Sequence, residues 1–192
     1  MTSDASPRSL TGFLLVATPA LSDSEFAHSV IYLCAHTPED GAMGLVVNKH
    51  LSHPGQDALF DQLGIEPAPS KRRIGVCKGG PVEDERGFVL HSPDWTSDSS
   101  VVVDAERTLT ASLDILRDIA DGSGPRDVLL AIGHASWAPG QLEEELIRHS
   151  AWMVAPATQA LVFGGDHAGK WRRALASINM DPLTLTGAVG HA

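Results

Sequence analysis

One short segment constrains the fold of this chain more than any other, because residues 128–132 are apolar at every position. A continuous run of this kind, rich in Val, Leu and Ile, is typical of a strand that is buried on both faces. Such a strand needs covering layers on both sides, and a chain of 192 residues can supply them by burying about 70% of its unfolded surface. We therefore expect an α/β domain, with residues 1–192 forming one unit.

Other short apolar runs predict the remaining strands. Residues 29–35 and 42–47 are rich in Val, Ile and Leu, and residues 37–41, which read Thr-Pro-Glu-Asp-Gly, predict a hairpin between them. Residues 13–17 faintly resemble a signal peptide, but the run is too short for one, and we interpret it as the first strand. Further strands are expected at residues 74–77, 87–90 and 101–103, and short strands or buried turns at 151–154 and 161–163.

Helices are predicted where apolar residues recur every three or four positions. The clearest spans residues 108–120, with an apolar stripe of Leu109, Leu113 and Leu116. A second spans residues 139–149, with Pro139 at its first position and acidic side chains toward its positive end. Shorter helices are expected at residues 57–63 and 170–178, loops at 66–70 and 79–86, and a loose tail at 1–10.

The balance of charge limits the partners that this chain can bind. Fourteen Lys and Arg against 24 Asp and Glu give a net charge of −10. Such a field repels DNA, RNA and anionic membranes. The two basic runs, residues 71–73 and 170–173, are more typical of solvated faces than of a nucleic-acid footprint. Since no apolar run reaches the length of a membrane span, we expect a cytoplasmic protein without direct nucleic-acid or membrane contact.

Cysteines and histidines do not complete a metal site in the sequence. Cys34 and Cys77 lie in apolar runs and are expected to be buried free thiols. His36, His91 and His134 each close a predicted strand, and if they met at one sheet edge they would suit zinc. The more ordinary interpretation is that each is hydrogen-bonded to neighbouring backbone. We therefore expect no metal and no cofactor.

Two further motifs suggest chemistry without completing it. Residues 164–171 have the spacing of a phosphate-binding loop as far as Lys170, but Trp171 stands where a Ser or Thr hydroxyl would hold magnesium. Ser136 lies close to His134, but the glycines of a nucleophile elbow are absent around it. We interpret the first motif as a glycine loop before a helix, while a Ser–His arrangement between distant segments stays open.

Several segments, taken in order, resemble the YqgE/AlgH family of bacterial proteins. They read Gly-Phe-Leu-Leu-Val-Ala-Thr-Pro at 12–19, Ser-Val-Ile-Tyr-Leu at 29–33, Gly-Ala-Met-Gly-Leu-Val-Val-Asn at 41–48, Gly-Gly-Pro-Val at 79–82 and Gly-Phe-Val-Leu-His at 87–91, followed by Trp137, residues 140–145 and Trp152. The resemblance runs from about residue 10 to the end of the chain. The sequence departs from the family pattern at His50, where proline is usual, and at His134 and Ser136, where an aromatic residue and glycine are more common.

The resemblance implies an α+β fold, with a β-rich single domain whose bifurcated, partly barrel-like sheet is surrounded by helices. The family carries the label of a transcriptional regulator. Because the charge argues against direct DNA contact, the resemblance implies regulation through a protein or small-molecule partner.

Our leading hypothesis for function is a non-enzymatic binding or regulatory module that acts through such a partner. Gln141 can donate and accept hydrogen bonds at a helix start, and Glu143 can cap that helix or contact a ligand. Equally, both side chains could merely satisfy local amide groups. The competing hypotheses are a hydrolase or metal-dependent enzyme that uses the strand-end histidines, and the transcriptional regulator of the family label. The candidate surface consists of Asn48, Gly79, Gly80, Pro81, His91, Trp137, Gln141 and Glu143.

Overall fold

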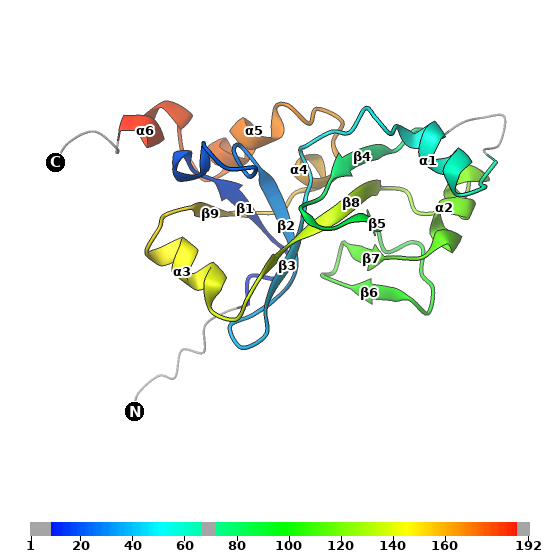
Figure 1. Ribbon diagram of the computed structural model, residues 1–192, viewed down its shortest axis with the longest axis horizontal. Helices are drawn as coiled ribbons and strands as arrows, with labels where there is room; N and C mark the ends of the chain where they lie inside the picture. Colours follow the sequence, from blue (N-terminus) through cyan, green and yellow to red (C-terminus); the bar gives the residue numbers. More distant parts are fainter. Residues whose placement is uncertain (1–8, 67–71, 188–192) are drawn as a thin grey trace.

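The computed structural model describes residues 9–66 and 72–187, which form one sheet flanked by helices (Figure 1). The strands are β1 (Phe13–Ala17), β2 (Val30–Thr37), β3 (Gly41–Val46), β4 (Gly75–Lys78), β5 (Val82–His91), β6 (Ser100–Val102), β7 (Thr108–Thr110), β8 (Val128–Trp137) and β9 (Trp152–Pro156). The helices are the 3-10 turn η1 (Pro19–Leu21), α1 (Gln56–Gln62), α2 (Leu113–Ala120), α3 (Gln141–Ile147), α4 (Gln159–Phe163), α5 (Lys170–Ser177) and α6 (Pro182–Gly187). The strand order is β6-β7-β5-β8-β3-β2-β1-β9, and β4 pairs with β8 outside this path.

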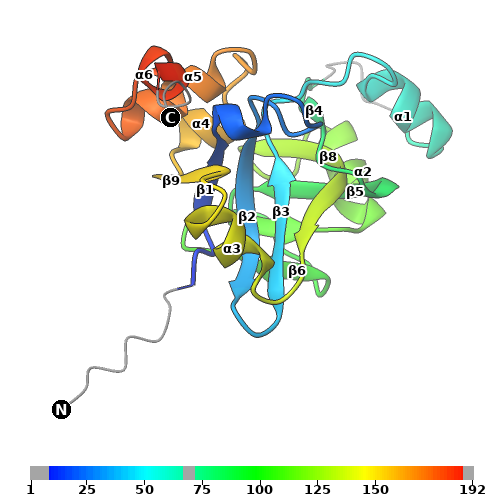
Figure 2. The same cartoon turned by 60° about the vertical axis from the view of Figure 1, so that its left-hand side comes forward.

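Strand β8 is the centre of the sheet and the place where it divides. Along one edge β8 pairs with β5 in the antiparallel sense. Along the other edge its first half pairs with β4 in parallel and its second half pairs with β3 in the antiparallel sense. Two strands therefore branch from one edge of β8, and the sheet curls around the core (Figure 2). The α+β fold with a bifurcated, partly barrel-like sheet is confirmed.

The branch point depends on glycines because two backbones cross there in close contact. The amide of Gly79 donates to the Ile132 carbonyl at 2.8 Å. A Cβ atom on Gly79 would lie 2.2 Å from the carbonyl oxygen of Gly133, and one on Gly80 would lie 2.1 Å from the carbonyl carbon of His134. No side chain fits at either position, since real Cβ contacts are never this short.

The core has layers on both sides of the sheet, as the apolar run of residues 128–132 predicted. Helices α4 and α5 cover one side of the β1–β2 branch and α3 covers the other. Helices α1 and α2 pack over the far end of β5 and β8 (Figure 1). Within β8, Leu129 belongs to the first of these clusters and Leu130 to the last, and both are buried. The prediction of a strand covered on both faces is therefore confirmed at its middle residues.

Most predicted strands are confirmed to within a few residues, including the β2–β3 hairpin. Three predictions were wrong. The loop expected over residues 79–86 ends early, because β5 begins at Val82. The start of the helix expected at 108–120 is strand β7, whose Thr110 is buried against His91. Residues 161–163 belong to helix α4, which Thr158 caps by accepting a bond from the Leu161 amide.

The ends of other predicted elements also differ from expectation. Pro139 is not the first residue of its helix, because Gly140 is the N-cap of α3, with φ of 76°. Of the tail expected at residues 1–10, positions 1–8 lie outside the described residues. Leu10 is held in place, because its amide donates to Nδ1 of His36 at 2.9 Å. Most of the loop expected at 66–70, and Lys71 of the first basic run, also lie outside the described residues. Across residues 9–66 and 72–187, every helix is too short or too polar to cross a bilayer.

Candidate functional site

The structure contains an aromatic pocket between α3, strands β8 and β9, and the turn that follows η1. Its cavity has a volume of about 440 Å³. Three aromatic rings contribute to its wall, and they meet at steep angles: Phe26 lies 5.8 Å from Trp152 at 66°, and Trp137 lies 6.0 Å from Trp152 at 77°. The remaining lining residues are Ala20, Leu21, Ser24, Ser136, Gln141, Glu145, His149 and Ala151.

The carboxylate of Glu145 is the polar centre of the aromatic pocket. Its Oε2 accepts hydrogen bonds from the indole nitrogens of Trp137, at 3.0 Å, and Trp152, at 2.8 Å. Its Oε1 accepts a bond from the side-chain amide of Gln141 at 2.9 Å. A carboxylate that accepts several such bonds is fixed in both position and orientation. The three donors come from β8, β9 and α3, so the whole local fold sets the direction of this charge.

Helix α3 presents Glu145 to the pocket because three of its other side chains fix the helix to the sheet. Leu142 is buried in the apolar cluster beneath it. Gln141 accepts a bond from the Ala138 amide at 3.0 Å, so its side chain closes the turn before the helix. Glu143 accepts a 2.7 Å bond from Nε2 of His36, whose Nδ1 accepts from the Leu10 amide. This network assigns the His36 proton to Nε2.

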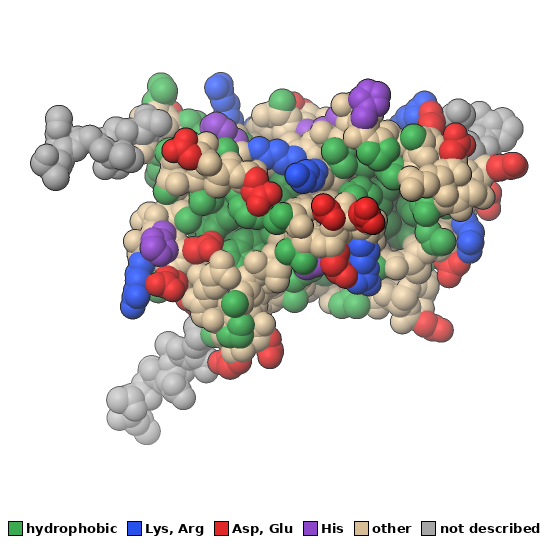
Figure 3. Space-filling view, viewed as in Figure 1, with side chains coloured by type: hydrophobic (Ala, Val, Ile, Leu, Met, Phe, Trp, Pro, Cys, Tyr) green, Lys and Arg blue, Asp and Glu red, His purple; other side chains and the backbone are tan. Residues whose placement is uncertain are grey.

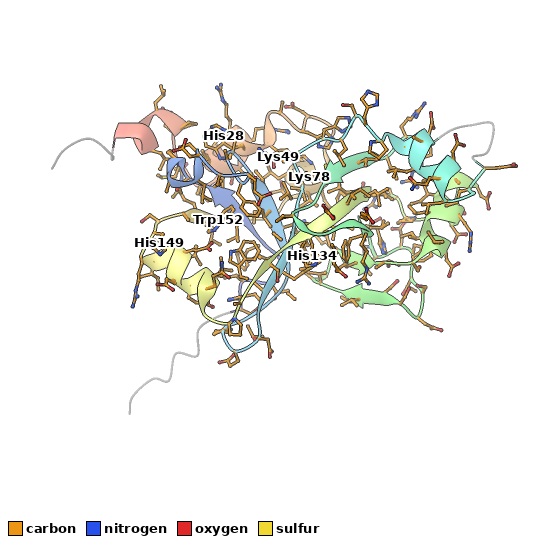
Figure 4. All side chains as sticks on the ribbon, viewed as in Figure 1. His28, Lys49, Lys78, His134, His149 and Trp152 are labelled. Atoms are coloured by element: carbon orange, nitrogen blue, oxygen red, sulfur yellow. The ribbon has the colours of Figure 1, made fainter. Side chains whose placement is uncertain are left out.

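The surroundings of the aromatic pocket are acidic. Its lining residues Ser24 and Phe26 alternate along the chain with Asp23 and Glu25, which are both exposed. Figure 3 shows an apolar hollow above α3 with acidic side chains around it. Figure 4 places Trp152 and His149 on this same side of the molecule. The pocket thus combines apolar walls, one fixed carboxylate and a negatively charged surround.

The structure brings together some of the residues that the sequence predicted as a binding surface. Trp137 and Gln141 both line the aromatic pocket, and Glu143 anchors the helix that carries it. Asn48 lies elsewhere, where its side chain accepts from the Val30 amide and donates to the His28 carbonyl. Pro81 is exposed.

The other predicted residues have structural roles. Gly79 and Gly80 face the β8 backbone and form no open anion cradle. His91 is completely buried. Its ring bonds the Ser92 carbonyl and the Thr110 hydroxyl, both at 2.8 Å. Burial lowers the pKa of His91 below its usual value.

The three strand-end histidines do not converge on one site. His36 pairs with Glu143, His91 with Thr110, and His134 contacts Glu83 at 3.2 Å. The described part of the chain holds no group of three or more His, Cys, Asp or Glu side chains suited to binding a metal ion. The ordinary interpretation, in which each histidine satisfies its neighbours, agrees with these contacts.

The two remaining motifs are also explained by local structure. Lys170 of the phosphate-loop-like segment turns inward, and its ammonium group donates to the carbonyls of Val47 and Val162 at 2.9 and 2.8 Å. Ser136 is exposed and pairs with Met43 across the β3–β8 ladder. Cys34 and Cys77 are buried free thiols, as predicted.

Sequence reasoning did not select Glu145, Trp152 or Phe26 as site residues. Glu145 and Trp152 were visible only as parts of the family pattern. They are seven positions apart in sequence, and no local motif links them to Trp137. A clue existed in the two tryptophans that flank a Glu-rich helix, because buried indole N–H groups need acceptors.

Comparisons with known proteins agree on one family. The chain matches the AlgH-like family over residues 14–183. A UPF0301 protein of Gluconobacter oxydans is 64% identical over 183 residues, which cover 95% of this chain and 98% of that protein. A UPF0301 protein of Cereibacter sphaeroides is 46% identical over 184 residues, or 95% of this chain and 99% of that one.

Two solved structures resemble the fold. The solution structure of AlgH from Pseudomonas aeruginosa is 34% identical and superposes with a TM-score of 0.76, with both chains fully covered. A crystal structure from Corynebacterium diphtheriae is 23% identical with a TM-score of 0.63, and it covers 84% of this chain and 85% of that one. The second likeness supports the fold alone. On the family match and the level of identity together, this chain belongs to the AlgH-like, or UPF0301, family.

Proposed function

We propose that this chain is a non-enzymatic binding module, and that its aromatic pocket takes the cationic headgroup of a small amine or of a basic side chain on a protein partner. The observation that carries this proposal is the Glu145 carboxylate, which is fixed by two indole N–H groups and one amide at the wall of the pocket. A carboxylate that pairs with no Lys or Arg of residues 9–66 and 72–187, beside three aromatic rings, has the chemistry that recognises ammonium and guanidinium groups.

The hydrogen bonds of Glu145 leave room for a ligand. A carboxylate offers about four lone-pair sites across its two oxygens. Two are used on Oε2 and one on Oε1, so Oε1 can accept one more bond. The nearby aromatic rings favour a cation further, because the face of an aromatic ring carries partial negative charge.

The size and charge of the surroundings support the same ligand class. A cavity of about 440 Å³ lies within the range of roughly 300–1,000 Å³ that is typical of small-molecule sites. A net charge of −10, with Asp23 and Glu25 beside the pocket, attracts cations and repels anions during encounter. Regulation through a protein partner, as the family label implies, would then depend on a basic side chain that enters this pocket.

The test is a titration of ¹⁵N-labelled protein with arginine methyl ester and with tetramethylammonium, followed through the indole N–H signals. We expect the Trp137 and Trp152 signals to shift while the Trp95 signal, which reports an indole bonded to Asp118, stays unchanged. Glu145→Gln keeps an acceptor oxygen but removes the charge, and should abolish the shifts.

Glu144→Gln is the matched control, because it removes one charge from the exposed side of the same helix. It should bind as the native chain does. Equal loss of binding in both variants would show that only the general acidity of the protein matters. Absence of any shift at millimolar ligand would refute the proposal. A response to the arginine ester but not to tetramethylammonium would identify a hydrogen-bonding cation as the ligand.

A further inference from the structure

The cations of this acidic chain are unevenly distributed over the described residues. Five Lys and Arg side chains have no carboxylate within 4.0 Å in residues 9–66 and 72–187: Lys49, Arg72, Lys78, Lys170 and Arg172. By contrast, seven arginines each pair with an Asp or Glu: Arg73, Arg86, Arg107, Arg117, Arg126, Arg148 and Arg173. Four of them, Lys49, Lys78, Lys170 and Arg172, gather at one place in the fold, whereas Arg72 lies elsewhere and donates to the carbonyls of Ser123 and Arg126.

That place is a cationic groove lined by His28, Asn48, Lys49, His167, Trp171 and Arg172, with a cavity of about 290 Å³. Lys78 lies next to it, because the Lys78 amide donates to the Lys49 carbonyl at 2.8 Å. Figure 4 shows His28, Lys49 and Lys78 in a row on one side of the molecule, and Figure 3 shows basic side chains gathered there. The groove therefore unites the start of α5 with the ends of β3 and β4.

The groove is built on well-fixed elements. Asn48 ties the end of β3 to the turn before β2 through bonds to His28 and Val30. The Trp171 indole donates to the Ala17 carbonyl at 2.8 Å. The rings of His28 and Trp171 pack edge to face, with 4.5 Å between their centroids and 89° between their planes. These contacts hold His28, Asn48 and Trp171 in place before any ligand arrives, which lowers the entropic cost of binding.

A further positive charge lies beneath the groove. The ammonium group of Lys170 is buried and donates to two carbonyls, and no carboxylate of the described residues pairs with it. Burial lowers the pKa of Lys170, and it lowers the pKa of Lys49 too. An anion seated in the groove would offset the burial of both lysines, because a nearby negative charge favours their charged form.

We infer that the cationic groove binds a small ligand that carries a phosphate group. Lysine and arginine that converge without carboxylates are the groups that recognise phosphate oxygens. The His28–Trp171 wall gives a planar organic portion of such a ligand an aromatic surface. A long polyanion would meet the net charge of −10 on the rest of the molecule, whereas a small phosphate ester would contact only the groove. This site is separate from the aromatic pocket, and its test does not depend on the function proposed for that pocket.

The experiment is calorimetry with pyrophosphate and with adenosine monophosphate at low salt. We expect binding that weakens with added salt, and about a tenfold or greater loss of affinity for Arg172→Gln and for Lys78→Gln, since each removes a charged contact to phosphate. Arg148→Gln is the matched control, because Arg148 is exposed and belongs to α3's C-cap. It should change the affinity little.

Two outcomes would overturn the inference. One is the absence of a binding heat with both probes at millimolar concentration. The other is an equal loss of affinity in Arg148→Gln and Arg172→Gln, which would show a diffuse charge effect. Binding of the nucleotide but not of pyrophosphate would support the inference and assign the aromatic wall a part in recognition, whereas equal binding would assign recognition to the phosphate alone.

Discussion

Replacing the buried Lys170 by methionine should change how the stability of this protein depends on pH. The Lys170 side chain is fully buried, and burial lowers its pKa from 10.5 to about 8. The unfolded chain therefore binds the proton more tightly than the folded chain. Because one pKa unit corresponds to about 1.4 kcal/mol, burying the charged form costs about 3 kcal/mol of folding free energy at neutral pH.

The sign of this effect follows from the difference in proton binding. Between pH 8 and 10.5 the unfolded state holds more protons, so the folded state gains stability as pH rises through that window. From pH 7 to pH 10 the native chain should gain about 2.5 kcal/mol relative to Lys170→Met. Methionine keeps the length of the side chain but carries no charge, so it lacks this term at every pH.

The assay is guanidinium unfolding followed by tryptophan fluorescence at several pH values between 7 and 10. The difference in unfolding free energy between the two proteins removes the contributions of groups that titrate in both. Lys78→Met removes one positive charge from an exposed position and controls for the change in net charge. A difference between native and Lys170→Met that stays constant from pH 7 to pH 10 would refute the reasoning.

Three other perturbations have clear expected outcomes. Glu145→Leu should lower the free energy of unfolding by about 2–4 kcal/mol, because two buried indole N–H groups lose their acceptor. Thermal unfolding measures this change, and a loss of stability smaller than that of an exposed substitution would contradict the prediction. Arg107→Met should cost about 3–5 kcal/mol by leaving Asp104 without its buried partner, and recovery in the double variant with Asp104→Asn would confirm the pairing. Gly80→Ala should prevent folding, since its Cβ would overlap the β8 backbone. Gly122→Ala, at φ of 85° but in open space, should cost only about 1–2 kcal/mol. Similar soluble yields of the two variants would contradict the close crossing of backbones described at β8.

Local patterns predicted the strands well because the strands carry their own signal. The runs at residues 13–17 and 128–132 are continuous and apolar, and the hairpin turn at 37–41 has the residues that turns need. The error at residues 108–110 has a physical reason. Leu109 stands in helical spacing with Leu113 and Leu116, yet tertiary pairing with β5 and β6 places it in a strand.

The candidate site could be predicted only in part, because its contacts join distant segments. Gln141 was selected for its position at a helix start, and it does line the aromatic pocket. The bond from Trp152 to Glu145 depends on how β9 packs beside α3, which no local motif encodes. Similarly, the spacing of residues 164–171 could not show that Lys170 turns toward the Val47 carbonyl, which lies 123 positions away in sequence.

The rates at which a reagent labels the two buried thiols would measure how often this fold opens. Cys34 in β2 and Cys77 in β4 are 7% and 0% exposed, and burial raises the pKa of each, to about 12 and about 11. Only the thiolate attacks a disulfide reagent and displaces its leaving thiolate, so neither position can react at neutral pH until its strand separates from its neighbours. The labelling rate of each thiol therefore reports the opening of its own branch of the sheet. Equal rates would mean that both branches open together, and faster labelling of Cys77 would mean that β4 detaches from β8 while the β1–β2–β3 branch stays closed.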